Sequence, residues 1–473
     1  MNRRKPFESM YFILPLLGAV FCLWYVSSAS CDVVYSDYIR LINEYLPDVT
    51  DLEKLFTMDV FTRIPASFLQ RLINVELFDF SVTFDRLCGI AGLVICAFVL
   101  AVFSYRKKLG FLWYSFIMII LFSLNKWEIL LNGTAWAHLV SFGLFFIYYY
   151  IFDRSFFGDE NAFYKYSLIF LPFVILMFAG EYIAAFTAVM ILMLGYAIYR
   201  RFKEDSSYMG MFSWRVYLVC FITLMTAFMI YFVSRSFAVW EHAGATELSA
   251  IEVIRGNPLF IPRFFIKTFA GAVIGQETIA SFAGGNALSD NTVLAIGLFV
   301  IIIYLAAIVI FFIGKMYKKT LFPMMLLLSG GLNHVMVTIS RWIFLKESYA
   351  LSSRYSGQFM IGFIGIVIIF AIFTKKSDTG YTYRKRNNLK IVLPLLMSLF
   401  IVSGNLYTSY QEVKKAPYRE ANYEKMSEMI VHYEDFTEEE LLKNLEWHKS
   451  PEMLYNAIKI LKENKLNVFR EDK

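Results

Sequence analysis

The sequence predicts an all-α membrane protein, a polytopic bundle of transmembrane helices with interfacial helices in long external loops. The chain has 473 residues, of which 58% are hydrophobic and only 18% are charged, and its mean hydropathy is +0.54. A water-soluble chain carries about 25% charged residues. The apolar residues also lie in long blocks, and a bilayer core about 30 Å thick requires about 20 of them in a helix. Soluble, disordered, collagen-like and coiled-coil folds are therefore excluded.

About eleven apolar stretches qualify as membrane spans, because each is long enough to cross the bilayer or short but shielded by its neighbours. The fifth and sixth stretches are separated only by Gly180 and Glu181, and counting them as one helix would change the topology. The eleven stretches lie near residues 9–30, 86–104, 110–125, 135–152, 166–180, 182–199, 213–233, 291–313, 321–343, 357–374 and 390–406.

The basic residues predict which way the spans face, since Lys and Arg accumulate in short cytoplasmic loops. With eleven spans, every basic cluster falls on the same side, so the N-terminus is expected in the cytoplasm and the C-terminus outside. The first span is interpreted as a signal anchor, because it exceeds a signal-peptide core and no small-x-small site follows before Cys31. The basic clusters lie at residues 3–5, 106–108, 200–203, 315–319 and 375–390.

This orientation places the long polar segments outside the cell. A transmembrane domain is expected over 1–406, with external loops at 31–85 and 234–290, and an external helical tail over 407–473. Segments 38–46 and 60–77 of the first loop mix apolar and charged residues, which indicates amphipathic helices on the outer leaflet. The two halves of the chain show no matching hydropathy pattern, which argues against an inverted-repeat transporter.

Two carboxylates, Asp32 and Asp37, stand in the first outer loop just after the first span. A carboxylate at this position can act as a general base or orient an acceptor hydroxyl. The alternative is that both are solvated, with Asp37 in the first turn of an interfacial helix, where a negative charge is favourable. Composition alone favours the alternative.

Two cations in the second outer loop, Arg263 and Lys267, are interleaved with apolar residues. This pattern suits a segment at the level of the lipid headgroups, where a cation meets phosphate. The alternative is an interfacial helix whose cations extend to the surface without binding a substrate.

The third outer site has Arg341 at the end of the ninth span and Arg354 and Tyr355 at the start of the tenth. Arginine binds phosphate oxygens through two parallel N–H groups, which suits a lipid-linked phosphate or pyrophosphate. Interfacial anchoring by Arg, Trp and Tyr is the alternative. Because positive charge on the outer side runs against the positive-inside trend, the functional interpretation is favoured here.

Ionisable residues inside or near spans are functional candidates, and Glu181 and His334 qualify. Glu181 lies in a tight outer turn, where solvation explains it equally well. His334 lies in the middle of a span, and a hydrogen bond between two helices is the favoured interpretation. A further short outer turn supplies polar residues that can line the same cavity, namely Asn125, Lys126, Glu128 and Asn132.

No metal site or cofactor is predicted, although a requirement for a divalent metal is left open. The five cysteines are scattered, and His334 has no second ligand at metal spacing. No GxGxxG, Walker A, GxSxG or HExxH motif is present, so nucleotide binding and the common hydrolase mechanisms are unsupported. Nucleic-acid binding is not indicated.

Several features together resemble the bacterial polytopic glycosyltransferases of the GT-C type. They are a signal-anchor span followed by an acidic outer loop, about ten further spans, the Arg354-Tyr355 pair, and an external tail ending in Leu-Asn-Val-Phe at 466–469. The chain is most similar to membrane proteins of cell-surface polysaccharide and teichoic-acid loci. The resemblance implies an acidic base or acceptor-orienting group in the first loop, which is Asp37 or otherwise Asp32. It also implies a donor-phosphate contact at Arg354, with Arg341 as the second candidate.

The function expected from the resemblance is transfer of a sugar from a polyprenyl-phosphate donor to a cell-surface glycan or lipid-linked acceptor. The expected location is the cell membrane, with a multi-pass chain and its active face outside the cytoplasm. Membrane lipids, the lipid-linked donor and the acceptor are the expected partners. Two alternatives remain, a polymerase of lipid-linked repeat units and a non-enzymatic transporter or flippase of a lipid-linked saccharide.

Overall fold

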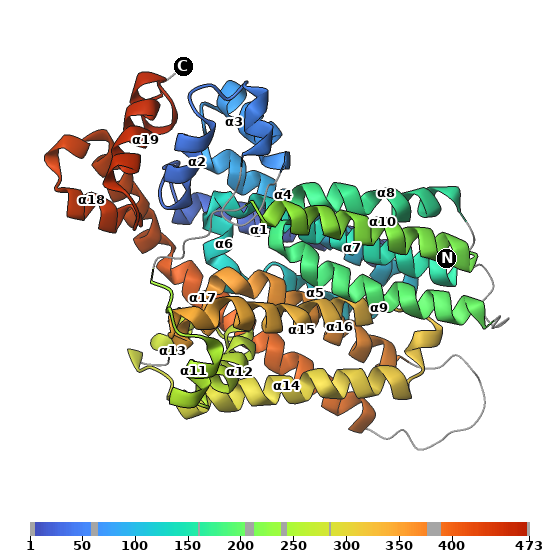
Figure 1. The fold of residues 1–473 in the computed structure, drawn as a ribbon. Coiled ribbons are helices and arrows are strands. Elements are labelled where there is room, and N and C mark those ends of the chain that lie inside the picture. Colours follow the sequence, from blue (N-terminus) through green and yellow to red (C-terminus); the bar gives the residue numbers. More distant parts are fainter. Residues whose placement is uncertain are drawn as a thin grey trace.

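The computed structural model describes residues 5–57, 65–158, 161–203, 212–237, 244–282, 285–375 and 389–470. Within these ranges the chain is helical, and its only β-pairing is an isolated bridge between Phe282 and Asn286. The predicted all-α class is therefore confirmed. The long helices, which run side by side in Figure 1, are α1 (Lys5–Ala29), α4 (Val82–Lys107), α5 (Phe111–Leu121), α7 (Trp136–Phe157), α8 (Ala162–Ala179), α9 (Ile183–Phe202), α10 (Trp214–Arg235), α14 (Asp290–Ile313), α15 (Phe322–Arg341), α16 (Ser353–Thr374) and α17 (Leu389–Val431).

Shorter helices gather at one end of this bundle, at the left of Figure 1. They come from the predicted outer loops and the tail, which are far apart in the sequence. These helices are α2 (Asp37–Tyr45), α3 (Pro65–Phe78), α6 (Trp127–Leu131), α11 (Ala250–Gly256), α12 (Phe260–Val273), α13 (Gln276–Ala280), α18 (Glu438–Asn444) and α19 (Pro451–Glu463).

Ten helical stretches of the described chain are long and apolar enough to cross a membrane. One of them, Ala162–Phe202, contains both α8 and α9, with the short 3-10 helix η4 (Gly180–Tyr182) between them. Contacts with α7 show that α8 runs antiparallel to α7 and that α9 runs parallel to it. The paired positions are Trp136 with Phe178 and Tyr148 with Leu168 in α8, and Phe145 with Phe186 and Phe156 with Tyr196 in α9. The stretch Ala162–Phe202 thus holds two antiparallel helices, with the predicted break at 180–181.

Three of the basic clusters meet at the opposite end of the bundle. Lys107 Nζ donates to the carbonyl oxygen of Lys319 at 2.9 Å, and Lys375 Nζ donates to that of Lys107 at 3.1 Å. Residues 3–4 and 376–388, which hold the remainder of two clusters, lie outside the described residues. The clusters that the described chain brings together therefore share one side, as the positive-inside argument requires. The orientation in the cell stays a prediction.

The two amphipathic segments of the first outer loop differ in what covers them. In α2 the residues Tyr38, Ile39, Arg40, Leu41, Ile42 and Tyr45 are buried in the protein, so α2 does not lie on the leaflet as expected. Helix α3 keeps an exposed apolar row, because Leu69, Ile73 and Leu77 are 51%, 45% and 71% exposed. This row fits an interfacial helix. Residues 60–64 of the predicted segment lie outside the described residues.

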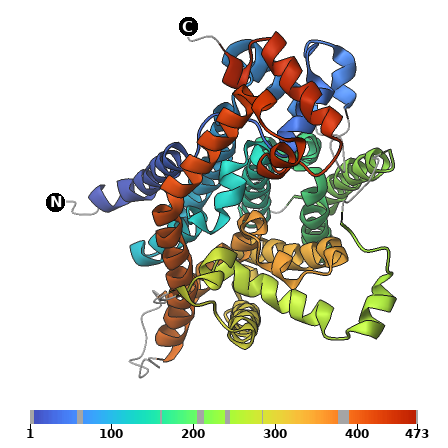
Figure 2. The same cartoon turned by 90° about the vertical axis from the view of Figure 1, so that its left-hand side faces the viewer.

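The predicted boundary between the last span and the tail is not a structural boundary. Helix α17 continues without a break through residue 407 to Val431, a length of 43 residues. At 1.5 Å per residue it is about 65 Å long, roughly twice the hydrocarbon thickness. One continuous helix, with Pro394 and Pro417 inside it, therefore joins the bundle to the tail, which Figure 2 shows beside the first loop.

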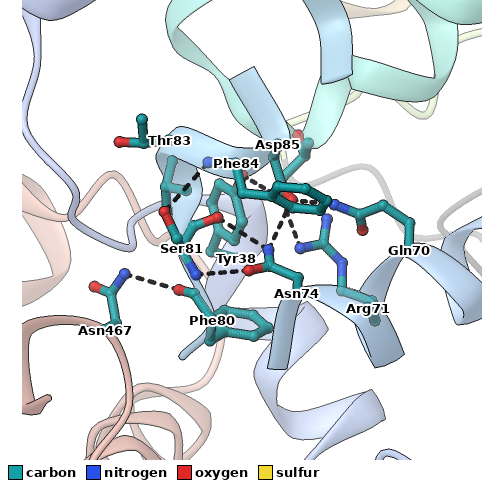
Figure 3. Close-up of polar contacts among 12 residues, drawn as sticks. Tyr38, Gln70, Arg71, Asn74, Phe80, Ser81, Thr83, Phe84, Asp85 and Asn467 are labelled. Atoms are coloured by element: carbon teal, nitrogen blue, oxygen red, sulfur yellow. Dashed lines mark hydrogen bonds and ion pairs between the residues drawn. The ribbon is translucent and has the colours of Figure 1, made fainter. Parts of the chain in front are cut away.

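A buried carboxylate joins α2, α3 and α4 at this end of the bundle (Figure 3). Asp85 is fully buried, and its oxygens accept hydrogen bonds from Tyr38 Oη at 2.7 Å, Arg71 Nη1 at 2.6 Å and Asn74 Nδ2 at 2.8 Å. Gln70 Nε2 is a fourth donor. A buried charge is stable only when it is paired and its lone pairs are satisfied, and this carboxylate meets both conditions.

The tail closes over this cluster through its final residues. Asn467 donates from its backbone to the carbonyl oxygen of Asp79 at 2.8 Å and from Nδ2 to that of Phe80 at 2.9 Å. Arg470 Nη1 donates to Asp32 Oδ2 at 2.9 Å. The Leu-Asn-Val-Phe segment therefore attaches the tail to the residues just before α4.

Replacing Arg71 with alanine tests the importance of the Asp85 cluster. The change leaves a buried charge with neutral donors only, so the free energy of unfolding should fall by about 3–5 kcal/mol. The measurement is thermal unfolding of the purified protein in detergent, with Lys459→Ala as the control. Lys459 pairs with Glu463 on the surface, and such pairs contribute little. Equal unfolding temperatures for both variants would contradict the assigned role.

Candidate functional site

Arg354 and Glu128 form an ion pair at the end of the bundle where the short helices gather. Arg354 Nε donates to Glu128 Oε1 at 2.8 Å, and Nη2 lies 2.6 Å from the same oxygen as an ion pair. Glu128 Oε2 accepts from the hydroxyls of Ser352 and Ser353 at 3.2 and 3.1 Å. The Arg354 side chain is still 49% exposed, and its Nη1 donates no hydrogen bond within the described chain. Part of the guanidinium is therefore available to a ligand.

Asp37 lies in the same region, and it is brought there by the tail. The backbone N–H of Ser36 donates to the carbonyl oxygen of Leu445 at 2.8 Å, so the next residues along each segment, Asp37 and Glu446, are neighbours. Partial desolvation raises the pKa of the Glu446 carboxyl although the residue stays accessible to solvent, Arg354 lowers it, and the charges of Glu128 and Asp37 raise it further. The three carboxylates and Arg354 therefore share one electrostatic environment.

The structure distinguishes Asp32 from Asp37 by the contacts that their carboxylates make. Asp32 Oδ1 accepts from the backbone N–H groups of Val82 and Thr83 at 2.7 and 3.1 Å, and its Oδ2 pairs with Arg470. Both oxygens thus hold the N-terminus of α4 and the tail. Asp37, half-buried in the first turn of α2, makes no side-chain hydrogen bond or ion pair within the described residues. Asp37 is the carboxylate that remains free for chemistry.

Three more of the predicted residues lie beside Arg354. The guanidinium of Arg341 lies over the ring of Tyr355, 5.6 Å from its centroid. Tyr182, which follows Glu181 in η4, is within electrostatic range of Glu181, Arg341 and Arg354. The structure therefore brings Arg341, Tyr355 and Glu181 to the region of Arg354.

A small cavity of about 30 Å³ lies next to the Arg354–Glu128 pair. This volume is sufficient for one or two water molecules. Gly275, in the wall of the cavity, packs closely against its neighbours. A Cβ on that residue would lie 2.7 Å from Asn125 Oδ1 and 2.9 Å from Thr408 Cγ2. The cavity is lined by Trp127, Glu128, Gly275, Gln276, Glu277, Ser353, Thr408 and Glu412.

Arg419 of α17 holds the far side of this cavity. It donates to Glu412 Oε2 from Nε at 3.0 Å and from Nη2 at 2.6 Å, and it also pairs with Glu277. Its guanidinium stacks on the ring of Trp127, 3.2 Å from the centroid. A desolvated cation on an indole face is a stabilising contact. The cavity wall is thus built from α6, α13 and α17 by charge pairing.

Sequence reasoning identified Glu128 as cavity-lining but missed Glu277, Glu412, Arg419 and Glu446. A signal existed for α17, because Glu412, Lys415 and Arg419 follow at i, i+3 and i+7 and so lie on one helix face. Glu446 gave no local signal, since it reaches the site only through the packing of the tail.

Arg263 and Lys267 belong to a separate group of charges. Arg263 Nη2 lies 2.5 Å from Asp290 Oδ2, and its Nε lies 3.0 Å from Glu347 Oε1. Lys267 pairs with the same two carboxylates. This quartet joins α12, the start of α14 and the 3-10 helix η8 (Glu347–Leu351). A lipid phosphate there would compete with existing ion pairs, and the predicted binding role remains untested.

His334 is packed in the interior of the bundle. Its ring lies between Phe269 and Phe359, with centroids 3.7 and 4.0 Å away, and its Nδ1 is 2.9 Å from Thr268 Oγ1. It is fully buried and links α15 to α12. The geometry matches the interhelical hydrogen bond favoured from the sequence.

Within the described ranges, no group of three or more His, Cys, Asp or Glu side chains is arranged to hold a metal ion. Comparison with protein-family models, curated proteins and solved structures finds no match to this chain.

The raised pKa of Glu446 predicts a pH dependence of stability. The folded state binds the Glu446 proton more tightly than the unfolded state does. The contribution of this proton to the free energy of unfolding is therefore fully present below the unfolded pKa. It is lost as pH rises through the folded pKa. Glu446→Gln removes the titration, so its unfolding temperature should fall less than that of the wild type over this interval. Parallel profiles by thermal unfolding in detergent would contradict the assignment.

Proposed function

We propose that this chain is a polytopic membrane glycosyltransferase that moves a sugar from a polyprenyl-phosphate donor to a glycan or lipid-linked acceptor. The observation that carries the proposal is that a carboxylate without a hydrogen bond, Asp37, lies within electrostatic range of a half-exposed guanidinium, Arg354, at one end of the bundle. The predicted topology places this end on the outer face of the cell membrane.

The proposed transfer requires one carboxylate to accept a proton and one cation to stabilise the leaving phosphate. An acceptor hydroxyl attacks the anomeric carbon of the donor sugar, the new C–O bond forms, and the bond from that carbon to the lipid phosphate breaks. The hydroxyl proton passes to a carboxylate, a role assigned to Asp37. The leaving phosphate retains the bonding electron pair, and Arg354 with Arg341 stabilises the charge that develops there.

The pairing of Arg354 with Glu128 supports this assignment. Two of its nitrogens are held by one carboxylate oxygen, so the guanidinium is fixed before a ligand arrives. Fixed donors stabilise a developing charge better than mobile ones, because they need no reorganisation during the reaction. A polymerase of lipid-linked repeat units would use the same groups with a larger donor, so the experiment below must separate the two.

Asp37→Asn should abolish the sugar modification without changing the abundance of the protein, because it removes the base and no contact of the fold. Asp32→Asn is the matched comparison, and it should lower abundance because Asp32 holds α4 and the tail. The measurement is composition and linkage analysis of surface glycans from a deletion strain complemented with each variant.

Loss of one sugar in the deletion strain, restored by the wild type alone, supports the transferase. An intact glycan in the Asp37→Asn strain would remove Asp37 from the mechanism. Unchanged composition with shorter chains would indicate the polymerase, and lipid-linked material trapped inside the cell would indicate the flippase.

Arg354→Lys should reduce transfer by about a hundredfold, the usual cost of losing one donor to a developing charge. One ammonium cannot pair with Glu128 and also reach a phosphate, whereas the planar guanidinium can. Transfer would be measured as the rate at which the sugar reappears after induced expression in the deletion strain. Arg106→Lys, at the opposite end of the bundle, is the control and should be fully active. Full activity of Arg354→Lys would exclude Arg354 from the site.

A further inference from the structure

We propose that the C-terminal tail supplies a substrate-binding residue, Glu446, and that Glu446 and Asp37 hold a neutral sugar acceptor by its hydroxyl groups. This inference rests on the proposed glycosyl transfer and assigns a side of the site to each substrate. The donor phosphate would lie toward Arg354 and Arg341, and the acceptor toward α2 and the tail.

The tail is firmly docked beside Asp37. In addition to the Ser36–Leu445 hydrogen bond, Tyr35 and Tyr423 are joined through their hydroxyls at 3.0 Å, and both side chains are buried. Asn43 Nδ2 donates to the carbonyl oxygen of Met453 at 2.9 Å. Contacts of this kind on both sides of Glu446 fix where its backbone lies relative to α2.

The Glu446 carboxyl lies in the electrostatic field of groups from several elements, but it pairs with none of them in the described chain. The groups that act on it are Asp37 of α2, Glu128 of α6, Arg354 of α16 and His448 of the tail itself. Its side chain is exposed and makes no hydrogen bond or ion pair within the described residues. The Glu446 carboxylate is therefore open to a ligand while remaining in the field of Arg354.

The fold does not require a glutamate at this position. Glu446 follows the end of α18 with a φ of +54°, where the backbone N–H of Trp447 donates to the carbonyl oxygen of Leu442 at 2.9 Å. This helix ending favours glycine or asparagine, because other side chains are strained in the left-handed region. Substitutions that suit this backbone can therefore remove the carboxylate without disturbing the tail.

The charges divide the site into two sides. Arg354 and Arg341 come from α16 and α15, whereas the unpaired carboxylates Asp37 and Glu446 come from α2 and the tail. Carboxylates accept strong hydrogen bonds from sugar hydroxyls. The same carboxylates repel a phosphate, because placing like charges next to each other strongly disfavours binding. The α2 and tail side therefore suits a neutral sugar unit and disfavours a phosphate-bearing polyol unit.

The test compares Glu446→Asp with Glu446→Asn in the complemented deletion strain. Both residues are tolerated in the left-handed region, and they have the same shape, so only the charge differs. The expected result is that Asp retains most of the modification while Asn lowers it at least tenfold, at equal abundance. The control is Lys465→Asn, at another left-handed position of the tail with φ of +53°, which should retain full modification.

Linkage analysis of the same glycans tests the acceptor class. The sugar lost on deletion is expected on a hydroxyl of a neutral sugar unit, and attachment to a phosphate-bearing unit would overturn the inference. Equal modification by the Asp and Asn variants would also overturn it, while loss of the sugar on deletion would leave the proposed transferase standing. Unchanged glycans in the deletion strain would overturn both.

Discussion

The buried carboxylate of Asp85 is the interaction on which the rest of this end of the molecule depends. Its four donors come from α2 and α3, so the charge holds both loop helices against the start of α4. Tyr38, one of the donors, directly follows Asp37. The position of the candidate base is therefore set by a cluster that takes no part in the chemistry, and a buried charge tolerates little displacement of its partners.

The tail imposes the second constraint, because it fixes the same loop from the other side. Asn467 holds the residues before α4, Arg470 holds Asp32, and Leu445 holds Ser36. The site thus combines segments near residues 37, 128, 354 and 446. A long continuous α17 makes this possible, since it carries the tail from the bundle to the first loop without an intervening loop.

The sequence predicted what depends on local composition. The apolar stretches and the α-helical class follow from lengths of apolar sequence, and the break at Gly180 follows from the distribution of the basic residues. Asp37, Arg354 and Glu128 were also identified, because charged residues beside spans are conspicuous. The distinction between Asp32 and Asp37 could not be predicted, since it depends on hydrogen bonds to residues 50 or more positions away. The place of Glu446 in the site likewise depends on tertiary packing, which local sequence does not encode.

The pairing of Arg354 with Glu128 also explains how a strong cation can remain exposed at a membrane surface without being permanently neutralised. Glu128 shares its second oxygen with two serine hydroxyls, so it can hold the guanidinium in place through one oxygen while Nη1 stays open. A phosphate that binds there gains a prearranged donor and displaces no ion pair. At the Arg263–Lys267 quartet both cations are matched by carboxylates, and an anion would have to separate them first. This difference in pairing, rather than the number of positive charges, favours the region of Arg354 over the quartet as the candidate anion site.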